Sequence, residues 1–243
     1  MIGGFDLALV WNSLPELALG LVTTLQLTLL TVLGGILLSL PLGVLRASPN
    51  RWVAGPIWAY TYFFRGTPML IQLFLIYYGL AQFKLVRASD LWPILREAWW
   101  CCLIAFTLNT VAYTVEIVAG ALRNVPLADI EAARSFGMSP WAILKRIKLP
   151  LAIRILFPAY TNEVIFILQS TSLASTVTVL DLTGAARVII ARTFSPYELF
   201  ITIALVYLVL TYLTLWLFRL VERRLYRHLQ AYRSEITSAP SMR

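Results

Sequence analysis

Long apolar runs alternate with short polar links along this chain, and four of the runs are uninterrupted. They cover residues 17–45, 98–122, 153 to about 168, and 197–221. About 20 apolar residues are enough to cross the ~30 Å hydrocarbon core of a bilayer. Each run therefore predicts, or begins, a membrane-spanning helix.

A fifth apolar segment, residues 52–83, is interrupted by Arg65, Gly66, Thr67 and Pro68. It is too short for two crossings with a turn and too long for one straight helix. Because glycine and proline weaken or break helices, we predict one span that is kinked at Gly66 and Pro68. The pattern thus predicts an all-α membrane protein with five spans.

Two further polar stretches lie between the predicted spans. Residues 84–97 predict a polar loop. Residues 169–192 are rich in Ser and Thr, and they predict the end of the fourth helix followed by a re-entrant or surface helix. Irregular backbone at membrane depth is tolerated only where protein or water covers it.

The one long polar segment between two spans is residues 126–150, hereafter the hairpin segment. Pro126 can open a helix, and Gly137 can end it in the left-handed conformation. Ser139 can cap a second helix, which Pro150 would end. The segment therefore predicts a helix, a tight corner and a helix.

Small residues give the first helix of this segment a thin surface. Ile130 and Ala133 recur at helical spacing, and Ala132 and Ala133 would let another backbone come close. This pattern is typical of a docking surface. On spacing alone, an ordinary surface hairpin is an equally good interpretation.

Composition places the chain in the membrane class. Apolar residues make up 59% of its 243 residues, charged residues 13%, and the mean hydropathy is +0.77. We expect one membrane domain over residues 1–221 and a basic cytoplasmic tail over 222–243. The net charge of +8 lies beside apolar spans, which indicates contact with anionic membrane lipid and not nucleic-acid binding.

The distribution of charge also predicts the orientation. Residues 46–51, 123–154 and 219–243 together carry a net charge of +10, whereas the N-terminus and the segments 84–97 and 181–192 sum to zero. Basic residues favour the cytoplasmic side. Five spans with the N-terminus outside and the C-terminus inside satisfy this rule and place the hairpin segment in the cytoplasm.

Several polar side chains fall inside the predicted spans. Asn109, Tyr113 and Glu116 project from one face of the third span, and Glu163 and Ser170, with Gln169 beside it, mark the fourth. A carboxylate at the bilayer centre costs at least about 2.5–3.5 kcal/mol, so it needs a water-filled path or a fixed partner. These residues are our candidate substrate path.

The alternative is that the carboxylates only fasten helices. Glu116 and Glu163 would then pair with cations of the chain such as Arg65 or Arg123. Arg65 itself, with Gly66 and Pro68, is a candidate gate or kink, although a snorkelling arginine at a helix break would look the same.

Motifs for catalysis are absent from the sequence. There is no GxxxxGK[ST] loop, no spacing typical of metal ligands and no nucleophile with a base. We therefore expect no enzyme activity, no metal site and no cofactor in this chain.

The hairpin segment resembles the "EAA" loop of ABC importer membrane subunits. The resemblance rests on Glu131, Ala132, Ala133, Gly137, Ile147, Leu149 and Pro150. In that family the loop couples the membrane subunit to a separate cytoplasmic ATPase, so the resemblance implies the same role here. ATP and Mg would be bound by that partner.

Other motifs are similar to the polar amino-acid uptake branch of these permeases. They are residues 64–68, 112–117, 123–126, 162–163 and 170–173, and the run 105–110 is especially similar to permeases that import histidine, lysine, arginine and ornithine. The resemblance implies a five-helix type I importer half in the bacterial inner membrane. Its implied partners are a second homologous permease, an ATPase dimer and a periplasmic solute-binding protein.

One departure from the family pattern concerns the second permease. Many members have Lys-Asp before the Thr-Ser-Leu, whereas this chain has Gln169 and Ser170. If the acidic position serves the path, a non-identical partner would supply it. A self-sufficient secondary transporter or channel for small cationic solutes is the alternative function.

Overall fold

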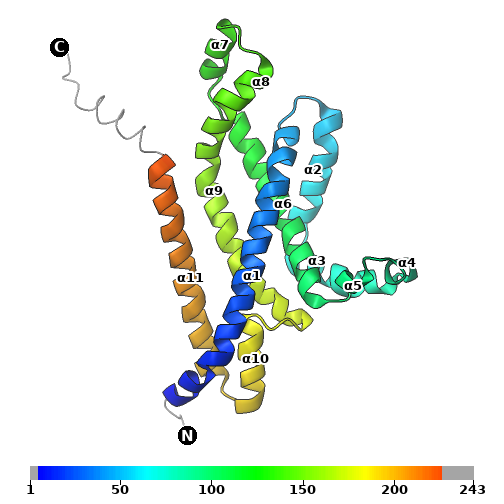
Figure 1. Ribbon diagram of the computed structural model, residues 1–243, viewed down its shortest axis with the longest axis vertical. Helices are drawn as coiled ribbons and strands as arrows, with labels where there is room; N and C mark the ends of the chain where they lie inside the picture. The colour runs from blue at the N-terminus through cyan, green and yellow to red at the C-terminus, as the bar shows by residue number, and fades with distance from the viewer. Residues whose placement is uncertain (1–4, 226–243) are drawn as a thin grey trace, which may run out of the picture.

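The computed structural model describes residues 5–225, which are almost entirely helical. Four long helices run along the length of the molecule (Figure 1). They are α1 (Leu7–Arg46), α6 (Ala98–Arg123), α9 (Leu149–Ser170) and α11 (Pro196–Leu225). Within the described residues, α1, α6, the continuous run Pro140–Val177 and nearly all of α11 are long and apolar enough to cross a membrane.

Shorter helical elements connect these four. On one side of the bundle they are α2 (Arg51–Gly66), α3 (Met69–Phe74), a π-helical turn (Leu75–Gly79), a 3₁₀ turn (Leu80–Gln82), α4 (Lys84–Arg87) and α5 (Trp92–Leu95). At the ends they are α7 (Leu127–Ser135), α8 (Pro140–Ile143), a π-helical turn (Leu144–Lys148), a 3₁₀ helix (Thr171–Val177) and α10 (Leu182–Thr193).

Helix α1 is packed closely along α6 by a stripe of small residues. An added Cβ at Gly35 would lie 2.5 Å from Cγ2 of Thr110, and one at Gly43 would lie 2.5 Å from Cγ1 of Val118. Apolar lipid gives helices little hydrophobic reason to associate, so close backbone approach supplies the packing energy. The whole buried face of α1, whose first part packs on α10, comprises Ser13, Leu17, Gly20, Thr24, Leu27, Thr31, Gly35, Ser39 and Gly43.

The start of α1 lies ten residues before the predicted Leu17. The side chain of Asp6 caps it by accepting a hydrogen bond from the amide of Leu9 at 2.9 Å. Pro15 is accommodated inside the helix. The predicted starts of the third and last spans agree with the structure within one residue, and the fourth begins four residues early.

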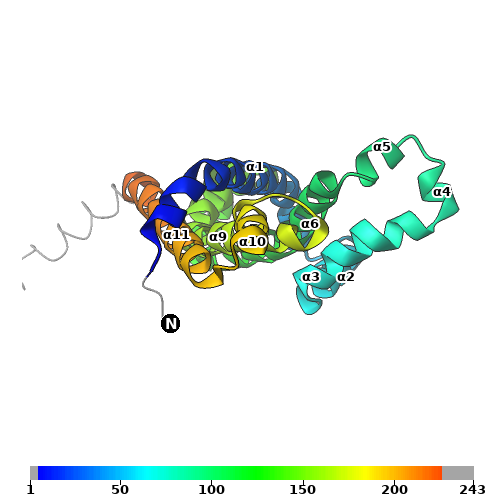
Figure 2. The ribbon, with the colours of Figure 1, turned by 90° about the horizontal axis from the view of Figure 1, so that it is seen from below.

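The expected second span is divided in two. At 16 residues α2 is about 24 Å long, shorter than the hydrocarbon core. The chain breaks at Thr67 and Pro68; Pro68 is a predicted kink position, whereas Gly66 is the last residue of α2. The segment from α3 to α5 then extends sideways from the bundle (Figure 2). The predicted polar loop 84–97 contains the short helices α4 and α5. The count of five spans stays a prediction.

The expected short helix after the fourth span is α10. Its 12 residues extend about 18 Å, too little to cross a membrane. The side chain of Asp181 caps it by accepting from the amides of Thr183 and Gly184, both at 3.0 Å. The backbone carbonyl of Asp181 lies against Gly20, so α10 packs on α1.

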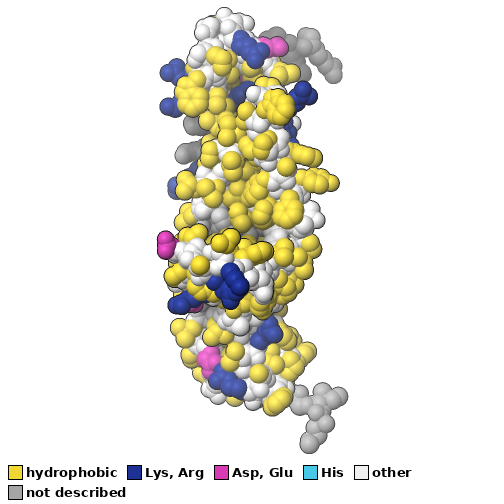
Figure 3. Space-filling view, turned by 90° about the vertical axis from the view of Figure 1, so that its right-hand side faces the viewer, with side chains coloured by type: hydrophobic (Ala, Val, Ile, Leu, Met, Phe, Trp, Pro, Cys, Tyr) yellow, Lys and Arg dark blue, Asp and Glu magenta, His cyan; other side chains and the backbone are white. Residues whose placement is uncertain are grey.

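Hydrophobic side chains cover much of the visible surface, with a group of Lys and Arg near the end that carries α7 (Figure 3). Large apolar residues of α1 and α11 are exposed, among them Leu37 at 72% and Val209 at 64%. Such a surface suits a lipid environment. Helix α11 continues past the predicted end at Val221, and residues 226–243 of the predicted basic tail lie outside the described residues.

Candidate functional site

The hairpin segment forms the helix and corner that the sequence predicts. Gly137 has φ +74°, and the amides of Gly137 and Met138 donate to the carbonyls of Arg134 (2.9 Å) and Ala133 (3.2 Å). This pair of bonds is the Schellman helix end, which favours glycine at the left-handed position. Ser139 accepts from the amide of Ala142 at 3.3 Å and starts α8.

The two faces of α7 differ in exposure. Ile130 and Ala133 are buried in a core with Ile143, so they hold the hairpin together and do not form its outer surface. Glu131, Ala132 and Phe136 are exposed, Phe136 at 88%. A partner would therefore meet Glu131 and Ala132, while Ala133 supports them from inside. Of the other predicted coupling residues, Gly137 and Pro150 are exposed and Ile147 and Leu149 are half-buried.

The prediction that Pro150 ends the second helix is wrong. The π-helical turn Leu144–Lys148 runs directly into α9, and Pro150 lies in the first turn of that helix. A proline ring clashes with the carbonyl four residues earlier in a regular α-helix, and the wider turn accommodates it. The hairpin and α9 consequently share one helical run.

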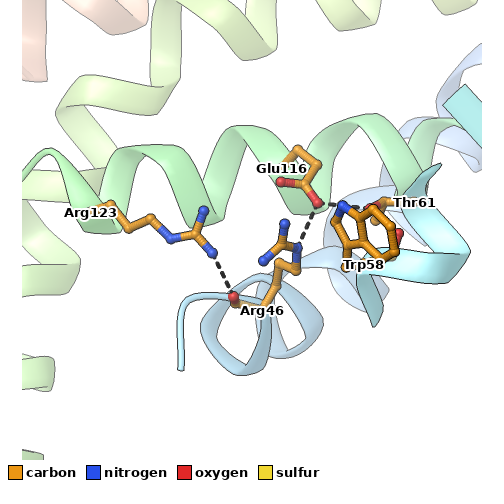
Figure 4. Close-up of polar contacts among 5 residues, drawn as sticks. All are labelled: Arg46, Trp58, Thr61, Glu116 and Arg123. Carbon is orange, nitrogen blue, oxygen red and sulfur yellow. Dashed lines mark hydrogen bonds and ion pairs between the residues drawn. The ribbon is translucent and has the colours of Figure 1, made fainter. Parts of the chain in front are cut away.

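Glu116 is held by partners from two other helices (Figure 4). Its Oε1 lies 2.7 Å from Nε of Arg46 at the end of α1 and 2.7 Å from the hydroxyl of Thr61 in α2. The sequence suggested cations such as Arg65 or Arg123 as partners, whereas the ion pair of Glu116 is formed with Arg46. Arg123 instead donates to the backbone carbonyl of Arg46 at 2.8 Å. Arg46 could not be singled out because it is 70 residues away along the chain.

Asn109 is turned toward the break between α2 and α3. It is 2% exposed, and its Nδ2 donates to Oε1 of Gln72 at 2.9 Å. Its own Oδ1 is buried and has no hydrogen-bond partner among the described residues. Gln72 was missed by the sequence reasoning, although an amide four residues after Pro68 in an apolar run is a usable signal.

Glu163 faces α6 from α9. Its Oε1 accepts from the hydroxyl of Thr110 at 2.7 Å, and the residue is 7% exposed. Gln169, six residues later, is exposed, and Ser170 is buried. Glu163 therefore lies between two helices, apart from the Arg46 pair that binds Glu116.

Arg65 and Tyr113 are brought together on the surface. The guanidinium carbon of Arg65 lies 5.3 Å from the ring centroid of Tyr113, a cation–π contact, and Phe166 packs 6.1 Å from the same ring. Gly66 is exposed at the end of α2, and an added Cβ there would meet nothing within 4 Å. Of the predicted path and gate residues, Arg65 and Tyr113 are thus brought together on this face.

Comparison with known families decides what kind of protein has this geometry. The family model described as "binding-protein-dependent transport system inner membrane component" matches residues 35–227. The chain belongs to this family.

Similar permeases have names that refer to amino-acid transport. The nopaline transport system permease protein NocM of Agrobacterium fabrum (strain C58) is 45% identical over 227 residues, covering 93% of this chain and 94% of NocM. The histidine/lysine/arginine/ornithine transport system permease protein HisM of Salmonella typhimurium is 45% identical over 213 residues, covering 87% of this chain and 91% of HisM.

A solved structure supports the fold of the permease. The crystal structure of an amino acid ABC transporter with histidines contains a chain with a TM-score of 0.81 and 33% identity, covering 92% of this chain and all of that one. The protein is thus an integral membrane permease of an amino-acid ABC importer, with the helical fold of type I importers.

Proposed function

We propose that this permease is one of two membrane-spanning subunits of an importer of basic amino acids, the class that includes histidine, arginine, lysine and ornithine. The observation that carries this proposal is the 45% identity to HisM over 87% of the chain. NocM is also 45% identical to this chain, over 93% of its length. We place the subunit in a bacterial inner membrane, with five spans, the N-terminus outside and the C-terminus inside.

The partners we propose are a second, non-identical permease, a cytoplasmic ATPase dimer that binds ATP and Mg, and a periplasmic solute-binding protein. The exposed side of α7 supports the ATPase contact. Glu131 and Ala132 project from it beside the corner at Gly137, and Ile130 and Ala133 fix the helix from the buried side. A rigid, thin surface at the end of the molecule suits insertion into a cleft of another protein. The substitution of Gln169 and Ser170 for the family's Lys-Asp favours a second permease of different sequence.

We assign the substrate path to the side of the molecule where Arg65 and Tyr113 meet. Gln169 is exposed and belongs to the same proposal. Asn109, Glu116 and Glu163 would act from behind this surface, because their polar atoms contact Gln72, Arg46 and Thr110 within the chain. The second permease would close the path from the other side.

The test is to substitute the exposed hairpin positions. Gly137→Asp and Glu131→Lys should abolish ATP-dependent uptake by membrane vesicles while the protein stays inserted. An added Cβ at Gly137 would meet nothing within 4 Å in this chain, so the substitution costs only the backbone strain of the left-handed conformation, about 1–2 kcal/mol. A loss of uptake would therefore report a disturbed contact with a partner protein.

The matched control is Glu97→Lys, the same charge reversal at an exposed site at the start of α6, away from the hairpin. It should leave uptake unchanged. Membrane abundance is measured for every variant. Normal uptake by both hairpin variants would remove the assignment of residues 126–150 as the coupling element.

A further inference from the structure

Three helices meet at the carboxylate of Glu116. Arg46 is the last residue of α1, Thr61 lies in α2, and Glu116 lies in α6. Both contacts to Oε1 measure 2.7 Å. The hydroxyl of Thr61 also lies 3.0 Å from the carbonyl of Trp58, but it has one hydrogen, and the charged and nearer carboxylate is the stronger acceptor (Figure 4).

This cluster adjoins the hairpin. Arg123, the last residue of α6, donates to the backbone carbonyl of Arg46 and stands three residues before Pro126. Glu116 lies seven residues before Arg123, about 10 Å along the helix. A displacement of the hairpin that moves the end of α6 would therefore reach Arg46 through its contact with Arg123 and, about two turns further along, through Glu116.

Helix α2 depends on this cluster because it has few apolar anchors. Only Ala54 and Thr61 of its 16 residues are buried. Its side chains make two polar contacts to α6 among the described residues: Thr61 with Glu116, and the hydroxyl of Tyr60 with the carbonyl of Leu108 at 2.5 Å. These polar contacts, together with the cation–π contact of Arg65 with Tyr113, therefore help to set the position of α2 and of the break at Thr67 that follows.

The ion pair between Arg46 and Glu116 is largely shielded from solvent. The side chains of Arg46 and Glu116 are only 15% and 19% exposed. Desolvation makes such a pair a weak source of net stability, whereas removing one partner leaves an unpaired charge that disturbs the surrounding arrangement. A pair of this kind is therefore better suited to fixing how three helices are arranged than to adding net stability.

We propose that Arg46 and Glu116 are positioning residues of transport: their ion pair makes the ends of α1 and α6 move with α2, so that displacement of the hairpin reaches the kinked segment from α2 to α3. This inference rests on the proposed role of the hairpin in coupling. It assigns a function to Arg46, and it assigns Glu116 a role that needs no contact with substrate.

The test uses the complete importer in proteoliposomes and measures amino acid taken up per ATP hydrolysed. Arg46→Gln and Glu116→Gln should each lower this ratio at least about fivefold, because ATPase activity continues without moving α2. The double variant should be no worse than the more damaged single variant, since both changes remove the same contact. Arg51→Gln, which removes an exposed charge at the start of α2, is the matched control and should keep the wild-type ratio.

A purely structural role would lower uptake and ATP hydrolysis together, by lowering the amount of assembled importer, and would leave the ratio intact. An unchanged ratio in both single variants would overturn the inference, and so would additive losses in the double variant. If Glu116→Gln does not insert, Thr61→Val removes one of the two contacts and must also lower the ratio. Gly137→Asp in the same preparations tests the hairpin separately, so a failure of the hairpin assignment can be told from a failure of the Arg46–Glu116 inference.

Discussion

The side-chain amide of Gln72 lies 2.7 Å from the backbone carbonyl of Phe64, across the break between α2 and α3. In a regular helix this carbonyl would accept from the residue four positions later, but that residue is Pro68, which has no N–H. Gln72 supplies the missing donor, also donates to the carbonyl of Thr67 at 3.0 Å, and is itself held by Asn109. The kink is therefore a built feature whose polar groups are largely satisfied.

We predict that Gln72→Leu lowers the stability of the permease by roughly 1–3 kcal/mol, because it removes the donor to the carbonyls of Phe64 and Thr67 and leaves Asn109 Nδ2 only its long 3.4 Å contact with the Phe64 carbonyl. Thermal unfolding in detergent measures this. Gln82→Leu, at an exposed glutamine on the projecting segment, should have little effect. Equal unfolding temperatures for the two variants would contradict the role of Gln72.

Close packing of α1 on α6 gives a second prediction. An added Cβ at Gly43 would lie 2.6 Å from Cβ of Val118, so Gly43→Ala should destabilise the protein by about 1–3 kcal/mol. Gly120→Ala is the control, because a Cβ there meets nothing within 4 Å and alanine favours helix by up to about 1 kcal/mol. The same unfolding assay applies, and equal losses at the two glycines would refute the packing argument.

The proposed topology predicts that the hairpin segment and the segment 84–97 are accessible from opposite sides of the membrane. A cysteine at Ser139 should react with an impermeant thiol reagent only from the cytoplasmic side, and one at Ser89 only from outside. Cys101 and Cys102 are buried in α6 and can be replaced first to remove background. Labelling of both introduced cysteines from one side would contradict five spans.

Substrate charge is tested at Glu163. We expect Glu163→Gln to reduce arginine uptake about tenfold, because glutamine keeps the shape and the bond with Thr110 but removes a charge worth roughly 1–3 kcal/mol to a cationic substrate. Membrane abundance and ATPase assembly should be unchanged, and Glu97→Gln, at an exposed carboxylate, serves as the control. Arginine uptake at the wild-type rate would make Glu163 a structural residue.

Sequence reasoning succeeded where the cause of a feature is local. The break at Pro68 and the corner at Gly137 depend on one residue's backbone preference, so both could be predicted from the chain itself. Pro150 shows the limit of this approach. The same backbone preference was present, but a π-helical turn just before it absorbed the strain and the helix continued.

Contacts between distant segments could not be predicted in the same way. The intramembrane carboxylates were recognised because charge is costly in lipid, yet their partners depend on how α1, α2 and α9 pack on α6. Arg46 looked like a charge that marks topology, and Thr110 was singled out only as part of the run 105–110. Their contacts with Glu116 and Glu163 are fixed only by the assembled helices.

The π-helical turn Leu144–Lys148 sets the direction in which the hairpin points. Such a turn contains one more residue than a regular α-helical turn, and one residue of an α-helix corresponds to a rotation of about 100°. Helix α9 and α8 lie on one continuous run, so this extra residue determines the angular position of Gly137 and α7 about the axis of α9. A deletion of a single residue here would barely change the hydropathy of the segment, but it would turn the exposed face of α7 toward a different side of the molecule.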